Sequence, residues 1–128
     1  MIENKDIEKL LGQSKDAYDR FLENGESDAL AEAGELLWEC LKAELNQEAN
    51  AKIENFNALK TEADLRGEKY SQLFFRCHHF HSWYFEGGVP NNFVAEKKLY
   101  IVTAKTLQKI LEDKNSRKIK KQAIENAA

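Results

Sequence analysis

The sequence predicts an all-α protein: an antiparallel up-and-down bundle of four main helices, with a fifth, short helix as one alternative for residues 46–60. Apolar residues recur every three or four positions over four long stretches, which is the spacing of a helix face buried in a core. No stretch alternates apolar and polar residues as a strand does. One Pro and six Gly in 128 residues leave these stretches nearly uninterrupted.

The first two helices are expected to form an antiparallel hairpin. Asn24 and Gly25 end the first helix, since Gly takes the left-handed cap conformation easily, and Ser27 is predicted to cap the second. The connection is short, as in helical hairpins. The first apolar stripe comprises Ile7, Leu10, Leu11, Ser14, Ala17, Tyr18, Phe21 and Leu22. The second comprises Leu30, Ala33, Leu37, Cys40 or Leu41, and Leu45.

Residues 46–60 allow two interpretations, a fraying helix end or a short connecting helix. The capping-box pattern from Thr61 to Asp64 predicts a new helix start, which Gly67 interrupts. From Glu68 the pattern is helical until Gly87 and Gly88. Asn91 or Asn92 is predicted to cap the last long helix. Its core face comprises Phe93, Tyr100, Ala104, Leu107 and Leu111.

The chain fits one domain, residues 1–115, followed by a basic tail, residues 116–128. Residues 1–64 carry a net charge of −9 and residues 65–128 one of +6. The basic region is suited to a phosphate backbone or an acidic protein face, and a solvated helix face is the alternative. The candidate RNA contacts within it are Lys97, Lys98, Lys105 and Lys109.

The sequence predicts a cytoplasmic protein. No apolar run approaches the roughly 20 residues of a membrane-spanning helix, and the acidic, polar start does not resemble a signal peptide. The two cysteines, Cys40 and Cys77, are expected to be buried thiols in a reducing compartment.

All three histidines lie within residues 74–86, in a run rich in aromatic residues. On a helix, His78 and His81 share a face, and so do Cys77 and His81. Arg76 lies about 60° from His79 and about 140° from His81, so only its long side chain would bring Arg76 and His81 to one ligand.

Three interpretations of this cluster remain open. Cys77 and His81 have metal-ligand spacing, but zinc sites need three or four ligands, so no metal and no cofactor are predicted. Alternatively, a neutral histidine accepts the proton of an RNA 2′-hydroxyl while Arg76 holds the phosphate, which needs no metal. In the third, His81 is half-buried at a helix contact and bonded to a backbone group or a carboxylate.

The run from Phe80 to Glu86 resembles a signature of small archaeal helical proteins of the PaREP type, within the HEPN superfamily (higher eukaryotes and prokaryotes nucleotide-binding domains). Residues 17–26 and 31–38 are similar to that family's first helical hairpin, and the resemblance covers residues 15–112. It implies a four- or five-helix bundle, usually a homodimer. Active members are metal-independent ribonucleases with an arginine, four to six residues, and then a histidine.

Arg76 and His81 match this motif and are the catalytic residues that the resemblance implies. His78, His79 and Glu86 are the assisting or substrate-binding candidates. Cys77 departs from the pattern, because active members often carry a polar residue directly after the arginine. The superfamily also includes partners of nucleotidyltransferases in toxin–antitoxin pairs.

Two functions follow as expectations, and they leave open whether the chain is an enzyme. The first is a HEPN-like domain that binds RNA or nucleotides, with metal-independent endoribonuclease activity of the toxin type as its reaction. The alternative is a non-catalytic, homodimeric interaction module that pairs with a nucleotidyltransferase-like protein. The direction in which Arg76 and His81 point distinguishes them.

Overall fold

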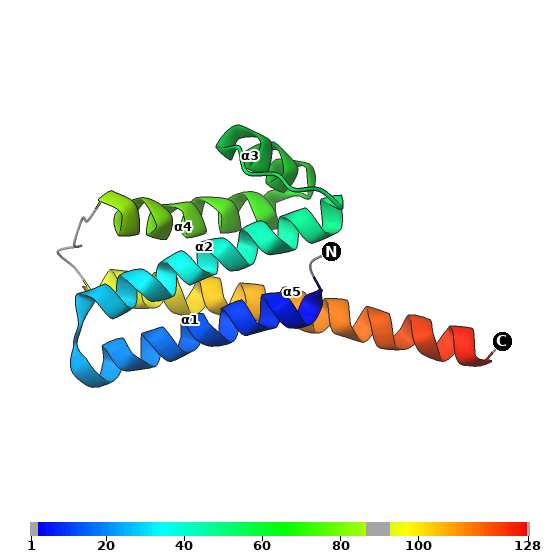
Figure 1. Cartoon of the computed structure of the whole chain (residues 1–128), viewed down its shortest axis with the longest axis horizontal. Helices are drawn as coiled ribbons and strands as arrows, with labels where there is room; N and C mark the ends of the chain where they lie inside the picture. Colours follow the sequence, from blue (N-terminus) through cyan, green and yellow to red (C-terminus); the bar gives the residue numbers. More distant parts are fainter. Residues whose placement is uncertain (1–2, 87–92, 128) are drawn as a thin grey trace.

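The computed structural model describes the backbone of residues 3–86 and 93–127 and the side chains of residues 3–83 and 94–117. The helices are α1 (Asn4–Asn24), α2 (Ser27–Ala49), α3 (Phe56–Leu65), α4 (Glu68–Glu86) and α5 (Phe93–Ala127) (Figure 1). The described residues contain no strand. The predicted all-α bundle of four long helices and one short helix is therefore confirmed.

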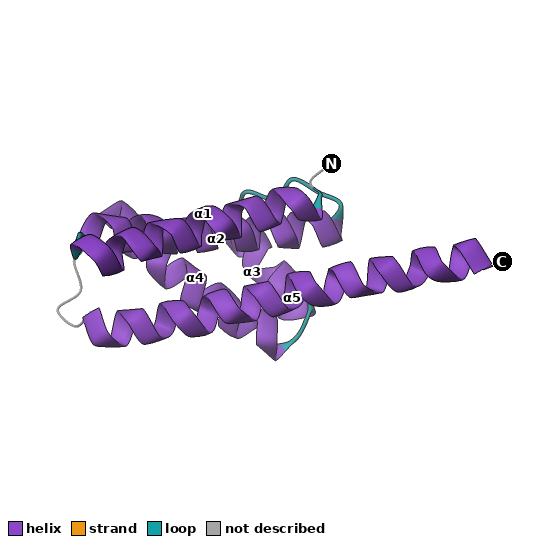
Figure 2. Cartoon of the chain, turned by 90° about the horizontal axis from the view of Figure 1, so that it is seen from below, coloured by secondary structure: helices purple, strands orange, loops and turns teal. Residues whose placement is uncertain are grey.

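Helix α2 lies at the centre of the bundle and contacts each of the other four helices. The short α3 covers one end of α2 and α4, and the last part of α5 projects beyond the other helices (Figure 1). Viewed from below, α1 and α5 run side by side across one face (Figure 2). Residues 116–127, expected as a charged tail, continue the helical backbone of α5.

The hairpin of α1 and α2 forms as predicted. Gly25 has φ 69°, in the left-handed region, and its N–H donates to the Phe21 carbonyl at 2.8 Å. The predicted cap at Ser27 is wrong by one residue, because Glu26 is the N-cap and Ser27 is already helical. Leu22 also departs from the predicted stripe: it is 53% exposed, since the core ends at Phe21.

Residues 46–60 contain both predicted alternatives, the end of one helix and the start of a short one. Helix α2 ends at Ala49, and Asn50 then adopts φ 51°. The Asn55 side chain accepts the Ala58 N–H at 3.1 Å and caps α3. The helix start predicted at Thr61 is wrong, because its hydroxyl donates to the Asn57 carbonyl within α3. Gly67, with φ 111°, separates α3 from α4 as expected.

Helices α2 and α4 approach closely at Gly34. A Cβ atom built on Gly34 would lie 2.6 Å from the Cβ and Cγ atoms of Phe80. The Phe80 ring is fully buried at this crossing. The absence of a side chain at Gly34 therefore allows α2 and α4 to approach this closely at the crossing.

A buried polar junction joins α1, α2 and α5. The Ser14 hydroxyl donates to the Ala33 carbonyl at 2.6 Å and lies 2.8 Å from the Tyr100 hydroxyl. With its own proton directed at Ala33, Ser14 accepts the proton of Tyr100. The Tyr100 ring stacks on Tyr18, with ring centroids 4.3 Å apart. The junction gives the Ser14 and Tyr100 hydroxyls a hydrogen-bond partner each and holds α5 against the hairpin of α1 and α2.

The predicted core face of α5 is confirmed at four positions. Tyr100, Ala104, Leu107 and Leu111 are buried, together with Ile110. The Phe93 side chain, the stop at Gly87 and Gly88, and the cap at Asn91 or Asn92 lie outside the described residues. Within the described part of the chain, no helix is long and apolar enough to cross a membrane.

Both cysteine thiols are free and buried, as predicted. Burial raises the pKa of Cys40 to about 12 and that of Cys77 well above its usual value. Since the thiolate is the reactive form, we expect neither to react with a disulfide reagent at pH 8 in the native protein. In guanidinium chloride, two thiols per chain should react. Rapid labelling of the native protein would contradict this packing.

Candidate functional site

The histidine-rich segment lies on α4, whose buried face divides the candidate residues between two edges. Leu73, Cys77 and Phe80 are fully buried and form the centre of this face. At 100° per residue, Arg76 lies on one side of this centre and His81 on the other. The core itself therefore separates the two predicted catalytic side chains.

His81 lies on the edge of α4 that faces α2. Its Nδ1 atom is 2.7 Å from a carboxylate oxygen of Glu35, and its ring stacks on Trp38 with centroids 5.1 Å apart. The imidazole is 27% exposed. Burial raises the pKa of Glu35, and the hydrogen bond from His81 opposes that shift. His81 is thus half-buried at a helix contact and bonded to a carboxylate, as in the third interpretation of the histidine cluster.

His78 shares this edge and belongs to an aromatic cluster. Its ring centroid lies 4.6 Å from that of Phe56 and 5.5 Å from that of Trp38. It also stacks on Phe74, one turn earlier in α4. These contacts between α2, α3 and α4 give His78 a packing role at the helix junction.

Arg76 and His79 lie on the opposite edge of α4, which faces α5. His79 is 54% exposed, and its Nε2 atom is 3.2 Å from a carboxylate oxygen of Glu96 on α5. Arg76 is half-buried and makes no hydrogen bond or ion pair with another described residue. The structure therefore groups Arg76 with His79 and not with His81. The Glu86 side chain lies outside the described residues.

The four candidate lysines lie on α5. Lys98, Lys105 and Lys109 are exposed along its outer side, whereas Lys97 is half-buried. Only Lys109 has an ion-pair partner among the described residues, Asp113 at 3.4 Å. Three exposed apolar side chains share this outer side of α5: Val94, Ile101 and Val102. We call these six exposed residues the α5 face.

An acidic counterpart lies on the neighbouring helix, and the sequence analysis did not single it out. Asp16, Asp19 and Glu23 are exposed on the outer side of α1, and none has an ion-pair partner among the described residues. We call these three residues the α1 face. Lys15 contacts Gln108, which places the second half of α1 beside the first half of α5. The two faces thus lie at the same level of the bundle.

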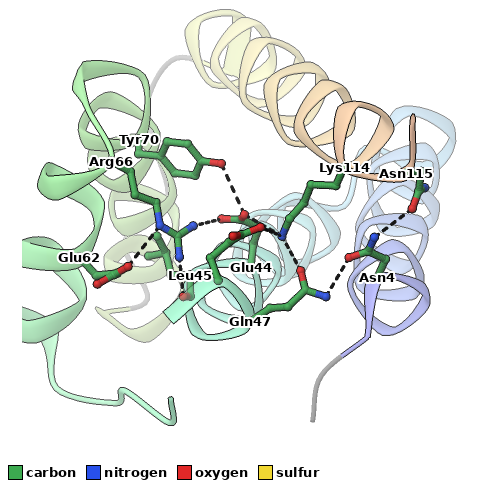
Figure 3. A network of polar contacts seen from close by, with 10 residues as sticks. Asn4, Glu44, Leu45, Gln47, Glu62, Arg66, Tyr70, Lys114 and Asn115 are labelled. Atoms are coloured by element: carbon green, nitrogen blue, oxygen red, sulfur yellow. Dashed lines mark hydrogen bonds and ion pairs between the residues drawn. The ribbon is translucent and has the colours of Figure 1, made fainter. Parts of the chain in front are cut away.

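A buried ionic cluster joins α2, α4, α5 and the connection between α3 and α4 (Figure 3). Glu44 is completely buried and accepts from Arg66 at 2.7 Å and from Lys114 at 2.9 Å. The Tyr70 hydroxyl lies 3.4 Å from the same carboxylate. We call these four residues the Glu44 cluster.

Both cations of the Glu44 cluster, Arg66 and Lys114, have further polar partners. Arg66 also donates to the Leu45 carbonyl at 2.6 Å, and Lys114 also pairs with Glu48 at 3.0 Å. Hydrogen bonding to Lys114 lowers the pKa of Glu48. With every charge engaged inside the protein, the cluster is a structural joint between helices.

No metal site is formed in the described part of the chain, where no three His, Cys, Asp or Glu side chains converge. Comparisons with protein-family models, with curated proteins and with solved structures found no match. The features of the chain that bear on its function are therefore the geometry of α4 and the charged faces of α1 and α5.

Proposed function

We propose that the chain is a non-catalytic interaction module that associates as a homodimer through the α1 face and the α5 face. The observation that carries this proposal is the complementarity of two adjacent, oppositely charged surfaces on one molecule. Lys98, Lys105 and the three carboxylates of the α1 face have no ion-pair partner among the described residues. A HEPN-like ribonuclease is the rival function, and a nucleotidyltransferase-like partner remains an expectation from the resemblance.

The positions of Arg76 and His81 favour the module over the ribonuclease. A shared phosphate needs a guanidinium and an imidazole on one side of the helix, and here the buried centre of α4 lies between them. His81 is also engaged by Glu35 and Trp38. Both features support a structural role for this histidine.

The α5 face has the composition of a protein contact. Val94, Ile101 and Val102 are between 41% and 62% exposed, and they lie on one side of a long helix within about two turns of one another. Burying them would remove apolar surface from water, and the interspersed lysines would select an acidic partner.

A second copy of this chain supplies such a partner. Because α1 and α5 are neighbours, a two-fold axis between them places the α1 face of each copy over the α5 face of the other. Asp16 and Asp19 would then approach Lys98 and Lys105 of the second copy. The same two contacts form twice, so the interface closes on itself.

Charge reversal on the α5 face is expected to weaken dimerisation strongly. In the variant Lys98→Glu, Lys105→Glu, like charges would face Asp16 and Asp19 of the other copy. We expect a dissociation constant about 100-fold higher in sedimentation velocity experiments, because like-charge juxtaposition costs several kcal/mol.

The variant Lys52→Glu, Lys69→Glu is the matched control, since it changes the net charge equally at exposed sites outside both faces. It should dimerise like the wild type. A wild-type chain that sediments only as a monomer at micromolar concentrations would contradict the proposal, as would equal weakening by both double variants.

The ribonuclease function makes a separate prediction. We expect no cleavage of single-stranded RNA by the purified protein in the presence of a chelator. Cleavage that persists with chelator and disappears in His81→Ala would instead support the rival function. Thermal melting of His81→Ala must accompany this assay, because the substitution removes the contacts to Glu35 and Trp38.

A further inference from the structure

A cavity between α4 and α5 lies apart from the α1 face and the α5 face. Its volume is about 480 Å³, within the range typical of small-molecule sites. The lining residues are Lys69 and Tyr70 from α4 and Ile110, Asp113, Ser116 and Arg117 from α5. Its two walls thus come from helices held together at the Glu44 cluster, which contains Tyr70.

The cavity is positively charged. Lys69 and Arg117 approach it from opposite walls, and neither has an ion-pair partner among the described residues. Asp113 is the one acidic residue of the lining, and Lys109 neutralises it at 3.4 Å. The guanidinium of Arg66, which does not line the cavity, lies 5.2 Å from the centre of the Tyr70 ring.

The lining also offers polar and apolar contacts. The Ser116 hydroxyl can donate to an anionic oxygen, and Arg117 can hold two such oxygens at once. Ile110 is buried and Tyr70 half-buried, so together they form an apolar floor. A ligand that combines a compact anion with a flat, less polar group would fit both the charged walls and the apolar floor of the cavity.

We propose that this cavity binds a phosphate monoester. The phosphate group would lie between Lys69 and Arg117 and accept from Ser116, while the esterified group would contact Tyr70 and Ile110. This inference is independent of the proposed dimer, because none of these residues belongs to the α1 face or the α5 face.

Titration of ¹⁵N-labelled protein with phenyl phosphate, followed by NMR, tests this proposal. We expect saturable shifts at Lys69, Tyr70, Ser116 and Arg117, and weaker binding of inorganic phosphate, which lacks the ring. Arg117→Gln and Lys69→Gln should each weaken phenyl phosphate binding about tenfold, since each removes a charge-assisted hydrogen bond.

Lys9→Gln is the matched control, because Lys9 is exposed on α1 and does not line the cavity. It should leave the affinity unchanged. Thermal melting should show all three variants folded, since the substituted side chains are exposed. Three results would overturn the proposal. They are the absence of saturable shifts, a phenyl phosphate affinity of Arg117→Gln equal to that of the wild type, and binding of single-stranded RNA without binding of phenyl phosphate.

Discussion

Gly34→Ala is expected to destabilise the bundle by about 1 kcal/mol net, although alanine is the better helix former. The new methyl group would lie 2.6 Å from the Cβ and Cγ atoms of Phe80, which is fully buried, so the side chain or the helix backbone must shift to admit it. Overpacking of this kind costs about 1–3 kcal/mol, more than the roughly 1 kcal/mol of helix propensity that alanine supplies. Urea denaturation measures the difference.

Gly12→Ala is the matched control for this prediction. Gly12 also lies within a helix, but apart from its chain neighbours and the surrounding helix backbone, no atom lies within 4 Å of the position its Cβ would take. Here only helix propensity acts, so we expect a gain of about 0.5–1 kcal/mol. Equal effects of the two substitutions would show that α2 and α4 do not cross as closely as described.

Glu44→Gln is expected to destabilise the protein by about 3 kcal/mol. Glu44 is fully buried and balances the charges of Arg66 and Lys114. An amide of the same shape keeps the packing but leaves both cations without this carboxylate, and removing one partner of a buried pair costs about 3–5 kcal/mol. Arg66 keeps its hydrogen bond to the Leu45 carbonyl and Lys114 keeps its pair with Glu48, so we expect a loss at the lower end of that range.

Two further substitutions compare the stability contributed by an ion pair of the Glu44 cluster with that of an exposed ion pair. Lys114→Met should cost less than Glu44→Gln, because Glu44 keeps its pair with Arg66. Lys60→Met breaks the exposed pair with Asp64 and should cost about 0.5 kcal/mol or less. A loss below about 1 kcal/mol for Glu44→Gln would contradict the role of the cluster as a structural joint.

Local sequence signals predicted most of the fold because the responsible interactions are themselves local. Gly25 ends α1 through its own backbone conformation, and the apolar spacing of α2 determines which side is buried. The prediction at Thr61 was wrong because two caps compete in that stretch. Asn55, further upstream, caps α3, and Thr61 then bonds within the helix.

The candidate site was harder to predict because its arrangement depends on contacts between helices. Helical geometry gave the angle between Arg76 and His81, but not the fact that the core fills the space between them. Glu44 and Lys114 resemble ordinary surface residues in the sequence, and only the packing of α2 against α5 buries both. The charged faces became visible only once α1 and α5 were known to be neighbours.

The proposed dimer is tested most directly by exchanging the charges of its two faces in one chain. The variant carries Asp16→Lys and Asp19→Lys together with Lys98→Glu and Lys105→Glu, so each face again meets an opposite charge in a second copy of the variant. The test measures the sedimentation velocity of the variant alone and of the variant mixed with the wild type. We expect dimers of the variant with itself and none with the wild type. A monomeric variant, or free mixing of the two chains, would contradict the proposed dimer.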